Sequence, residues 1–262
     1  MRKQYPGERM INLRIRDKSF KDMDLLIFDK DGTLFELYPY WSKVALKRAE
    51  LISKSLGIRD DSLISWITSA MGADLKNKKM NPKGPIGIYN RSYIQELLYN
   101  GLEKEGYPIE RDMISEAFKE TDEYINQDWV LKSALVPVKG LMEFLSKIED
   151  RCKCAICSYD QTGNLKHIAE MFDISDNFDL FLGGDLIKYP KPEPWGALKI
   201  MAELNVSPAN TVFLGDSIFD IECGKNAQCK YQIAVISDIS DAKSLMMRSD
   251  ATIRDYDEID LD

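Results

Sequence analysis

The chain has 262 residues, enough for one large domain or two small ones, and its 44% hydrophobic and 30% charged residues are typical of a soluble globular protein. Its longest apolar runs are too short to cross a membrane, and a net charge of -8 argues against general nucleic-acid binding. The N-terminus has charges but no apolar signal segment, and the number of cysteines is odd. We therefore expect reduced thiols and a cytoplasmic location.

The first 23 residues are mixed and charged, and nothing in them indicates a function. We expect residues 1–9 to be disordered, as the ends of many domains are. Met10–Arg16 alternates apolar and polar residues, which predicts an edge strand.

A buried strand is predicted at Leu25–Phe28, where four apolar residues follow one another. The apolar run stops abruptly at Asp29 and Asp31, whose side chains leave the strand end close enough to share one site. Because ligands of open α/β sheets bind beyond the carboxyl ends of the strands, this is where chemistry is expected. Gly32 allows a tight turn and Thr33 offers a hydroxyl group. The same composition also occurs in ordinary turns, so this motif alone decides nothing.

A helical region follows. Apolar residues recur at helical spacing between about residues 36 and 132, without the alternation of strands. The pattern is clearest in three stretches: Trp41 to Leu56, Ile94 to Leu102, and Met113 to Ile125. We therefore expect residues 37–134 to form a separate helical domain, inserted into a domain made of residues 1–36 and 135–262.

The helical region contains one loop rich in helix-breaking residues, Lys76–Pro85. It carries four lysines: Lys76, Lys78, Lys79 and Lys83. The loop is either a solvated connection or a mobile segment that meets an anionic ligand.

From Val136 onward, strands and helices alternate, which predicts a parallel sheet with helices on both faces and an α/β fold. The expected strands are Cys154–Cys157, Leu180–Leu182, Thr211–Leu214, Gln232–Ile236 and Ala251–Ile253, and the expected helices are Leu141–Ile148, Asn164–Met171, Trp195–Leu204, Ile218–Ala227 and Ala242–Met247. The acidic end, Asp255–Asp262, is interpreted as a solvated tail.

Cys152, Cys154 and Cys157 could be interpreted as a metal cluster. They lie in a predicted strand, and alternation puts the first two on one face and the third on the other. Buried core cysteines are therefore the better interpretation. His167 is the only histidine, and its place within a predicted helix indicates a surface or packing residue.

Polar residues follow three of the predicted core strands: Asp29 and Asp31, then Ser158, then Asp216. Lys191 precedes a proline at the start of a helix, and Asp220 lies one helical turn beyond Asp216. Each fragment alone is weak, since a serine can cap a helix and a lysine is usually a surface residue. Their order and their positions at strand ends together indicate one site.

These fragments resemble the four motifs of the haloacid dehalogenase superfamily. The resemblance covers about 36 residues at the start and about 130 at the end of the chain. It implies a three-layer, Rossmann-like parallel-sheet core, and the inserted helical domain looks like the cap of phosphoglycolate phosphatases and β-phosphoglucomutases. The implied function is a Mg²⁺-dependent phosphatase that acts on a small phosphorylated metabolite.

The resemblance also implies roles for single residues. Asp29 would be the nucleophile that forms an aspartyl-phosphate, and Asp31 the general acid and base. Asp29, Asp216 and the backbone carbonyl of Asp31 would bind Mg²⁺. Ser158 and Lys191 would bind the phosphoryl oxygens.

Three further residues complete the expected site. Gly32 and Thr33 are expected beside the phosphate. Asp220 would orient metal-bound water or Lys191 from outside the metal's coordination shell.

Other functions remain open. Asp31 argues against a dehalogenase, because a halide leaving group needs no acid. A phosphonatase would need an imine-forming lysine, for which Lys43 and Lys47 are candidates, although both look like ordinary helix-surface lysines. A phosphomutase, or a non-catalytic binding protein on the same core, stays an alternative.

Overall fold

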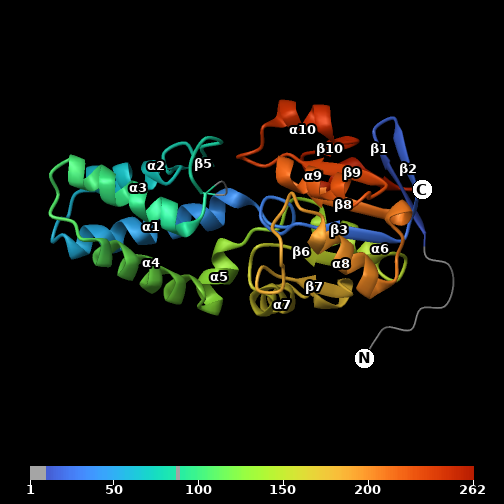
Figure 1. Ribbon diagram of the computed structural model, residues 1–262, viewed down its shortest axis with the longest axis horizontal. Coiled ribbons are helices and arrows are strands. Elements are labelled where there is room, and N and C mark those ends of the chain that lie inside the picture. The colour runs from blue at the N-terminus through green and yellow to red at the C-terminus, as the bar shows by residue number, and fades with distance from the viewer. Residues whose placement is uncertain (1–9, 87–88) are drawn as a thin grey trace. The chain divides into compact units, whose positions relative to one another are not determined.

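The computed structural model describes residues 10–86 and 89–262, so the expectation of disorder at residues 1–9 falls outside the described residues. The chain divides into two compact units (Figure 1). The core unit holds the described residues up to Phe35 and those from Pro137 onward, and the helical unit is Glu36–Val136.

A six-stranded sheet in the order β10-β9-β8-β3-β6-β7 forms the centre of the core unit. Its strands are β3 (Leu25–Phe28), β6 (Lys153–Cys157), β7 (Leu180–Leu182), β8 (Thr211–Gly215), β9 (Tyr231–Val235) and β10 (Ala251–Ile253). All neighbouring strands are parallel, which confirms the predicted α/β fold. β3 lies between β8 and β6 (Figure 1), so the first predicted strand is central.

Helices connect the strands of this sheet. They are α6 (Leu141–Ile148), α7 (Thr162–Met171), α8 (Trp195–Leu204), α9 (Ile218–Asn226) and α10 (Ala242–Arg248), with the short 3-10 helices η1 (Ser175–Asn177) and η2 (Pro208–Asn210). Ile27 of β3 belongs to a buried cluster with Ile200 of α8 and Cys223 of α9. The next residue, Phe28, packs against Phe178 with 5.9 Å between the ring centroids. Because both faces of β3 are covered, its sequence is continuously apolar.

A second, antiparallel sheet has the order β11-β1-β2. Its strands are β1 (Ile11–Ile15), β2 (Lys18–Met23) and β11 (Ile259–Leu261). The prediction of an edge strand at Met10–Arg16 was wrong in one respect, because β1 is the middle strand of this sheet. β2 was not predicted from the sequence, because only Phe20 and Met23 are buried and its other residues are charged or polar.

The interpretation of Asp255–Asp262 as a solvated tail was wrong. This segment forms the 3-10 helix η3 (Tyr256–Glu258) and β11. The side chain of Asp260 accepts a hydrogen bond from Arg14 of β1 at 2.9 Å, so cross-strand pairing uses the acidic residues that suggested a tail. Tyr256 is 2% exposed, stacks on Phe144 with 5.2 Å between ring centroids, and donates a hydrogen bond to the Thr33 carbonyl at 3.1 Å.

Removing the Tyr256 side chain should therefore destabilise the core unit. We expect Tyr256→Ala to lower the free energy of unfolding by about 3 to 5 kcal/mol, the usual cost of deleting a buried aromatic ring. Tyr256→Phe keeps the stack on Phe144 and loses one hydrogen bond, about 1 kcal/mol. Urea unfolding followed by circular dichroism measures both. An alanine variant as stable as the wild type would contradict the placement of this segment.

The helical unit consists of α1 (Leu37–Ser55), α2 (Asp61–Ala70), α3 (Arg91–Lys104), α4 (Arg111–Ile125) and α5 (Asp128–Ala134), with a small antiparallel pair, β4 (Ala73–Asp74) and β5 (Lys79–Met80). α1 buries its predicted apolar stripe, including Val44 and Ile52. α2 and α5 were not among the predicted stretches, although Asp60 caps α2 by accepting a hydrogen bond from the Ser62 amide at 2.8 Å. The four lysines of the Lys76–Pro85 segment are exposed.

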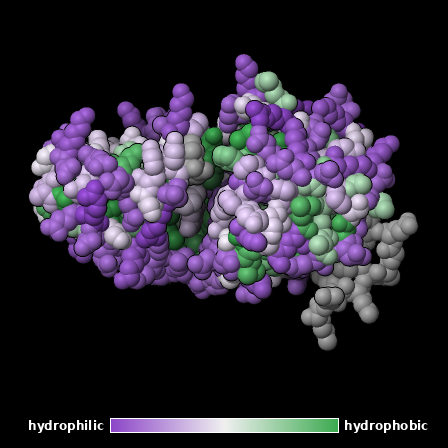
Figure 2. All heavy atoms as spheres, viewed as in Figure 1, coloured by the Kyte–Doolittle hydropathy of each residue, from purple (hydrophilic) through white to green (hydrophobic). Residues whose placement is uncertain are grey.

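The remaining sequence expectations concern surfaces and thiols. No helix in the described parts of the chain is long and apolar enough to cross a membrane. Hydrophilic side chains cover most of the visible surface of both units (Figure 2). All five cysteines are buried, which confirms the interpretation of Cys152, Cys154 and Cys157 as core residues. His167 lies exposed on α7.

Candidate active site

Three central strands carry candidate site residues to one edge of the sheet. Because β6, β3 and β8 are adjacent and parallel, their carboxyl ends are followed by Ser158, Asp29 and Asp216 at the same edge. The Asp29 amide donates a hydrogen bond to the Leu214 carbonyl at 2.9 Å, so the residue continues the ladder beyond β3. All three side chains are largely buried, with residue exposures of 2 to 7%.

Lys191, from the loop before α8, joins these strand ends. Its Nζ lies 2.6 Å from Asp29 Oδ1, 2.5 Å from Asp220 Oδ1 and 3.2 Å from the Cys157 carbonyl oxygen. The structure therefore brings Asp29, Lys191 and Asp220 together in one buried ion-pair network.

Asp220 lies in the first turn of α9 and is held by a capping box. The Ser217 hydroxyl accepts a hydrogen bond from the Asp220 amide at 3.3 Å, and Asp220 Oδ2 accepts one from the Ser217 amide at 3.0 Å. Both carboxylate oxygens of Asp220 are therefore engaged, one by Ser217 and one by Lys191. The spacing of Ser217 and Asp220 is a capping-box signal, so this role of Ser217 could have been found in the sequence.

Asp216 fits closely against the loop after β3. Gly32 has a φ of +75°, and a Cβ atom at this position would lie 2.1 Å from Asp216 Oδ2, so only glycine leaves room for the carboxylate. Ser237 donates a hydrogen bond to Asp216 Oδ2 at 2.6 Å, and Ser240 donates one to the Asp216 carbonyl at 2.7 Å. Ser237 and Ser240 come from the loop before α10, and no motif in the sequence marks them.

The other residues expected in the site lie on the loops around this network. The Thr33 hydroxyl is buried without a hydrogen-bond partner among the described residues. The Asp31 side chain is 30% exposed and forms an ion pair with Lys30 at 3.1 Å. The Ser158 hydroxyl accepts a hydrogen bond from the Asp160 amide at 3.3 Å. Lys30 and Asp160 were not predicted to be site residues.

Burial and like charges shift the titration of the site. Burial raises the pKa of Asp29 to about 7, and Lys191 opposes this rise. The pKa of Asp216 also lies well above its usual range, because the group is buried and faces the charges of Asp220 and Asp29. Burial raises the pKa of the Cys157 thiol to about 12, so the thiol beside Lys191 is neutral and is no rival nucleophile.

The donor set suits a divalent cation. Asp29, Asp216 and Asp220 each offer a carboxylate oxygen within 4.8 Å of the others, and no second group of this kind occurs among residues 10–86 and 89–262. Hard cations such as Mg²⁺ prefer oxygen ligands, and a positive charge would offset the burial and the repulsion that raise the pKa values of Asp29 and Asp216. Both carboxylate oxygens of Asp220 are engaged, whereas the hydrogen bonds to Asp29 and Asp216 use one oxygen of each, so Asp29 and Asp216 are the better candidate ligands.

The raised pKa values predict how the stability of the metal-free protein depends on pH. The pKa of Asp29 is about 7 when folded and near 3.8 in its ordinary state, so the folded protein holds this proton more tightly. Its contribution to stability is present at low pH and is lost as the pH rises through about 7.

The measurement is urea unfolding in chelator between about pH 5 and pH 8. We expect the free energy of unfolding to fall more steeply for the wild type than for Asp216→Asn, because the variant lacks one of the site's two carboxyl groups whose pKa is raised. Identical slopes for the two proteins would contradict the electrostatic description.

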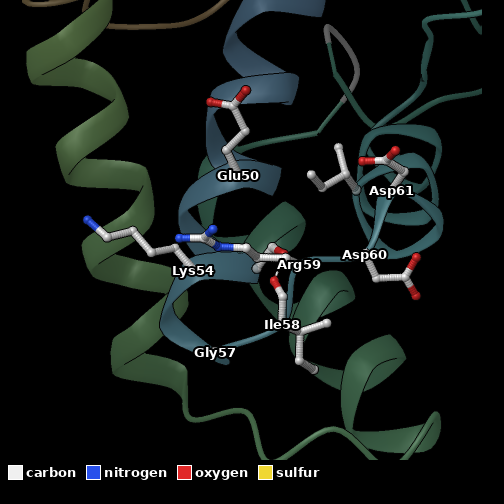
Figure 3. A pocket seen from close by; sticks show the side chains of 9 residues that line it. Glu50, Lys54, Gly57, Ile58, Arg59, Asp60 and Asp61 are labelled. Atoms are coloured by element: carbon white, nitrogen blue, oxygen red, sulfur yellow. Dashed lines mark hydrogen bonds between the residues drawn. The ribbon is translucent and has the colours of Figure 1, made fainter.

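A pocket elsewhere carries none of the predicted site residues. It lies in the helical unit, has a volume of about 600 Å³, and is lined by Glu50 and Lys54 of α1 and by the connection to α2, including Arg59 (Figure 3). Charges of both signs line it, and Asp60 at its rim already serves as the cap of α2. The predicted site residues lie at the sheet edge of the core unit instead.

Known proteins resemble this chain along most of its length. A family model described as haloacid dehalogenase-like hydrolase matches residues 23–228. A phosphoglycolate phosphatase of Shigella boydii is 34% identical over 212 residues, 80% of this chain and 80% of that protein. A phosphoglycolate phosphatase of Psychrobacter arcticus is 26% identical over 210 residues, 79% of this chain and 80% of that protein. A crystal structure from Haemophilus somnus, described as a predicted phosphoglycolate phosphatase, has a TM-score of 0.67 at 16% identity, covers 89% of this chain and 95% of that one, and shows likeness of fold alone.

Proposed function

The chain belongs to the haloacid dehalogenase-like hydrolase family, and we propose that it is a Mg²⁺-dependent phosphatase that hydrolyses a small phosphorylated metabolite through an aspartyl-phosphate on Asp29. The observation that carries the proposal is the buried network at the end of β3. It sets the Asp29 carboxylate beside the Lys191 ammonium and within reach of Asp216. Relatives named phosphoglycolate phosphatase support the reaction class and do not name the substrate.

The reaction proceeds in two steps. In the first, a carboxylate oxygen of Asp29 attacks phosphorus, the bond from phosphorus to the ester oxygen breaks, and Asp31 gives a proton to the leaving alkoxide. In the second, Asp31 takes a proton from water, and the resulting hydroxide attacks the phosphorus of the aspartyl-phosphate. Inorganic phosphate leaves, and Asp29 and Asp31 return to their starting states.

Other side chains counter the charge of the phosphoryl group. Ser158 and Lys191 bind its oxygens, with Gly32 and Thr33 of the adjoining loop beside them, and Asp220 holds Lys191 in place. Asp29, Asp216 and the backbone carbonyl of Asp31 would hold Mg²⁺, which would supply positive charge to offset the repulsion between the attacking carboxylate and the phosphate.

The residues of the core unit would act on any phosphoryl group, so other residues of the chain must select the substrate. We propose that residues 37–134 act as a cap domain and residues 1–36 with 135–262 as the catalytic domain. The buried, reduced thiols agree with the proposed cytoplasmic location.

The four exposed lysines of the Lys76–Pro85 segment offer positive charge for an anionic substrate. Replacing all four lysines by alanine should change the preference among phosphorylated metabolites. It should hardly change turnover of p-nitrophenyl phosphate, which has no second anionic group to recognise. Steady-state kinetics with both kinds of ester measures this. If kcat/KM stays at the wild-type value for both, the segment is a solvated connection.

A phosphate-release screen over a panel of phosphorylated metabolites, with and without Mg²⁺, tests the proposal. We expect release from at least one alkyl phosphate, and only in the presence of Mg²⁺. Conversion of a sugar phosphate to its isomer without phosphate release would instead identify a phosphomutase. Binding without any turnover would identify a non-catalytic protein on the same core.

A further inference from the structure

Lys30 is a buried charge between the two aspartates of the first motif. Its side chain is 4% exposed, and Nζ lies 3.1 Å from Asp31 Oδ1 and 3.0 Å from Asp160 Oδ2. A lysine is almost never so buried unless it is paired, and here the pairing is with two carboxylates. Lys30 therefore links the loop after β3 to the loop after β6.

The loop after β6, which carries Asp160, is held by several hydrogen bonds. Asp160 Oδ1 accepts a hydrogen bond from the Gln161 amide, and Asp160 Oδ2 accepts one from Asn164 Nδ2 of α7, both at 2.8 Å. The backbone carbonyl of Asp160 accepts a hydrogen bond from the Gly184 amide at 2.7 Å, and its amide donates to the Ser158 hydroxyl at 3.3 Å. The carboxylate that anchors Lys30 thus belongs to the same short loop as the serine assigned to phosphate binding.

The loop after β3, which carries Lys30 and Asp31, is also held by hydrogen bonds. The Lys30 carbonyl accepts hydrogen bonds from the amides of Leu34 at 2.9 Å and Phe35 at 3.1 Å, so the turn that carries Asp31 closes on Lys30 itself. Lys30 contacts Oδ1 of Asp31, so this oxygen can hold the carboxyl group in place while Oδ2 carries the proton and meets the substrate. Removing one partner of a buried pair leaves the remaining charges uncompensated, so the arrangement depends on all three side chains.

We propose that Lys30 is a positioning residue for Asp31: it holds the Asp31 carboxyl group against the Ser158–Asp160 loop, where that group can protonate the leaving oxygen of the substrate. The proposal rests on the proposed phosphatase function, and it adds a role for Lys30 and Asp160. A rival role is purely structural, in which Lys30 only ties two loops together and affects every substrate alike.

The leaving group separates these two roles. An alkoxide must receive a proton as it leaves, whereas p-nitrophenolate leaves without one. The value of kcat/KM reports the steps up to the transfer of the phosphoryl group to Asp29. If Asp31 is poorly placed, kcat/KM falls for an alkyl ester and stays near the wild-type value for p-nitrophenyl phosphate. A loss of fold or of phosphate binding slows both esters.

The experiment compares Lys30→Met with the wild type, using p-nitrophenyl phosphate and the best alkyl phosphate of the phosphate-release panel. We expect kcat/KM to fall at least about 30-fold for the alkyl ester, within the usual range for lost general-acid catalysis, and less than about threefold for p-nitrophenyl phosphate. Lys166→Met, which neutralises an exposed lysine on α7, is the matched control and should keep both values.

Asp160→Asn is the second variant, because it weakens the anchor and leaves Lys30 in place. It should show the same preference for the aryl ester with a smaller loss, and it carries the test alone if circular dichroism shows that Lys30→Met does not fold. Equal losses for the two esters, or no loss for either, would overturn the positioning role while leaving the phosphatase proposal intact. A wild-type protein that hydrolyses neither ester would overturn the phosphatase proposal and the inference with it.

Discussion

Asp29→Asn should lower phosphatase activity by at least about three orders of magnitude, equivalent to about 4 kcal/mol of transition-state stabilisation. The amide has nearly the shape of the carboxylate but cannot attack phosphorus as an anion. Asp29 is buried at the end of β3 with its carboxylate 2.6 Å from Lys191 Nζ, so the substitution removes the anion at that position. Phosphate release under saturating Mg²⁺ measures the effect.

Asp17→Asn provides the matched control for this variant. Asp17 is exposed in the turn between β1 and β2, so the same change of charge there should leave activity at the wild-type level. An Asp29→Asn protein that keeps a tenth of the wild-type rate would refute Asp29 as the nucleophile.

Removal of the metal should have an effect of similar size. We expect EDTA to abolish turnover and Mg²⁺ to restore it, because two buried carboxylates with raised pKa values and an incoming phosphate need a compensating cation. Ca²⁺ should inhibit, since it is larger than Mg²⁺ and takes more ligands. Full activity in the presence of chelator would end the Mg²⁺ hypothesis.

Asp216→Ala should mimic chelation, and excess Mg²⁺ should rescue it at most in part. The Ser237 hydroxyl donates a hydrogen bond to Asp216 Oδ2 at 2.6 Å, so Ser237→Ala is a useful companion variant. It should weaken the response to Mg²⁺ and keep activity at high Mg²⁺ concentration, because the carboxylate itself remains.

Local sequence patterns were sufficient for the central part of the fold. Leu25–Phe28 is apolar because both of its faces are buried, and a polar break then marks the end of the strand. The same pattern recurs before Ser158 and Asp216, and the alternation with helices makes the strands parallel. Parallel neighbouring strands bring their carboxyl ends to one edge, so residues far apart in sequence could be expected in one place.

Other contacts leave no local pattern. Ser237 reaches Asp216 from the loop after β9, and Asp160 reaches Lys30 from the loop after β6, but each is an ordinary polar loop residue in the sequence. The segment after Asp255 has too few residues to show a strand period, and its acidic residues meet their basic partners only when β1 lies beside it. Such contacts depend on tertiary placement, which sequence periodicity does not contain.

Trapping the covalent intermediate identifies the residue that attacks phosphorus. The protein is mixed with the best substrate of the panel and Mg²⁺, quenched in acid within one turnover, digested, and analysed by tandem mass spectrometry. We expect one phosphoryl group on the peptide that contains Asp29, assigned to the Asp29 side chain, and none in the Asp29→Asn protein. A phosphoryl group on another residue, or turnover without any phosphorylated peptide under conditions where the quench preserves acyl phosphates, would contradict the assignment of Asp29 as the nucleophile.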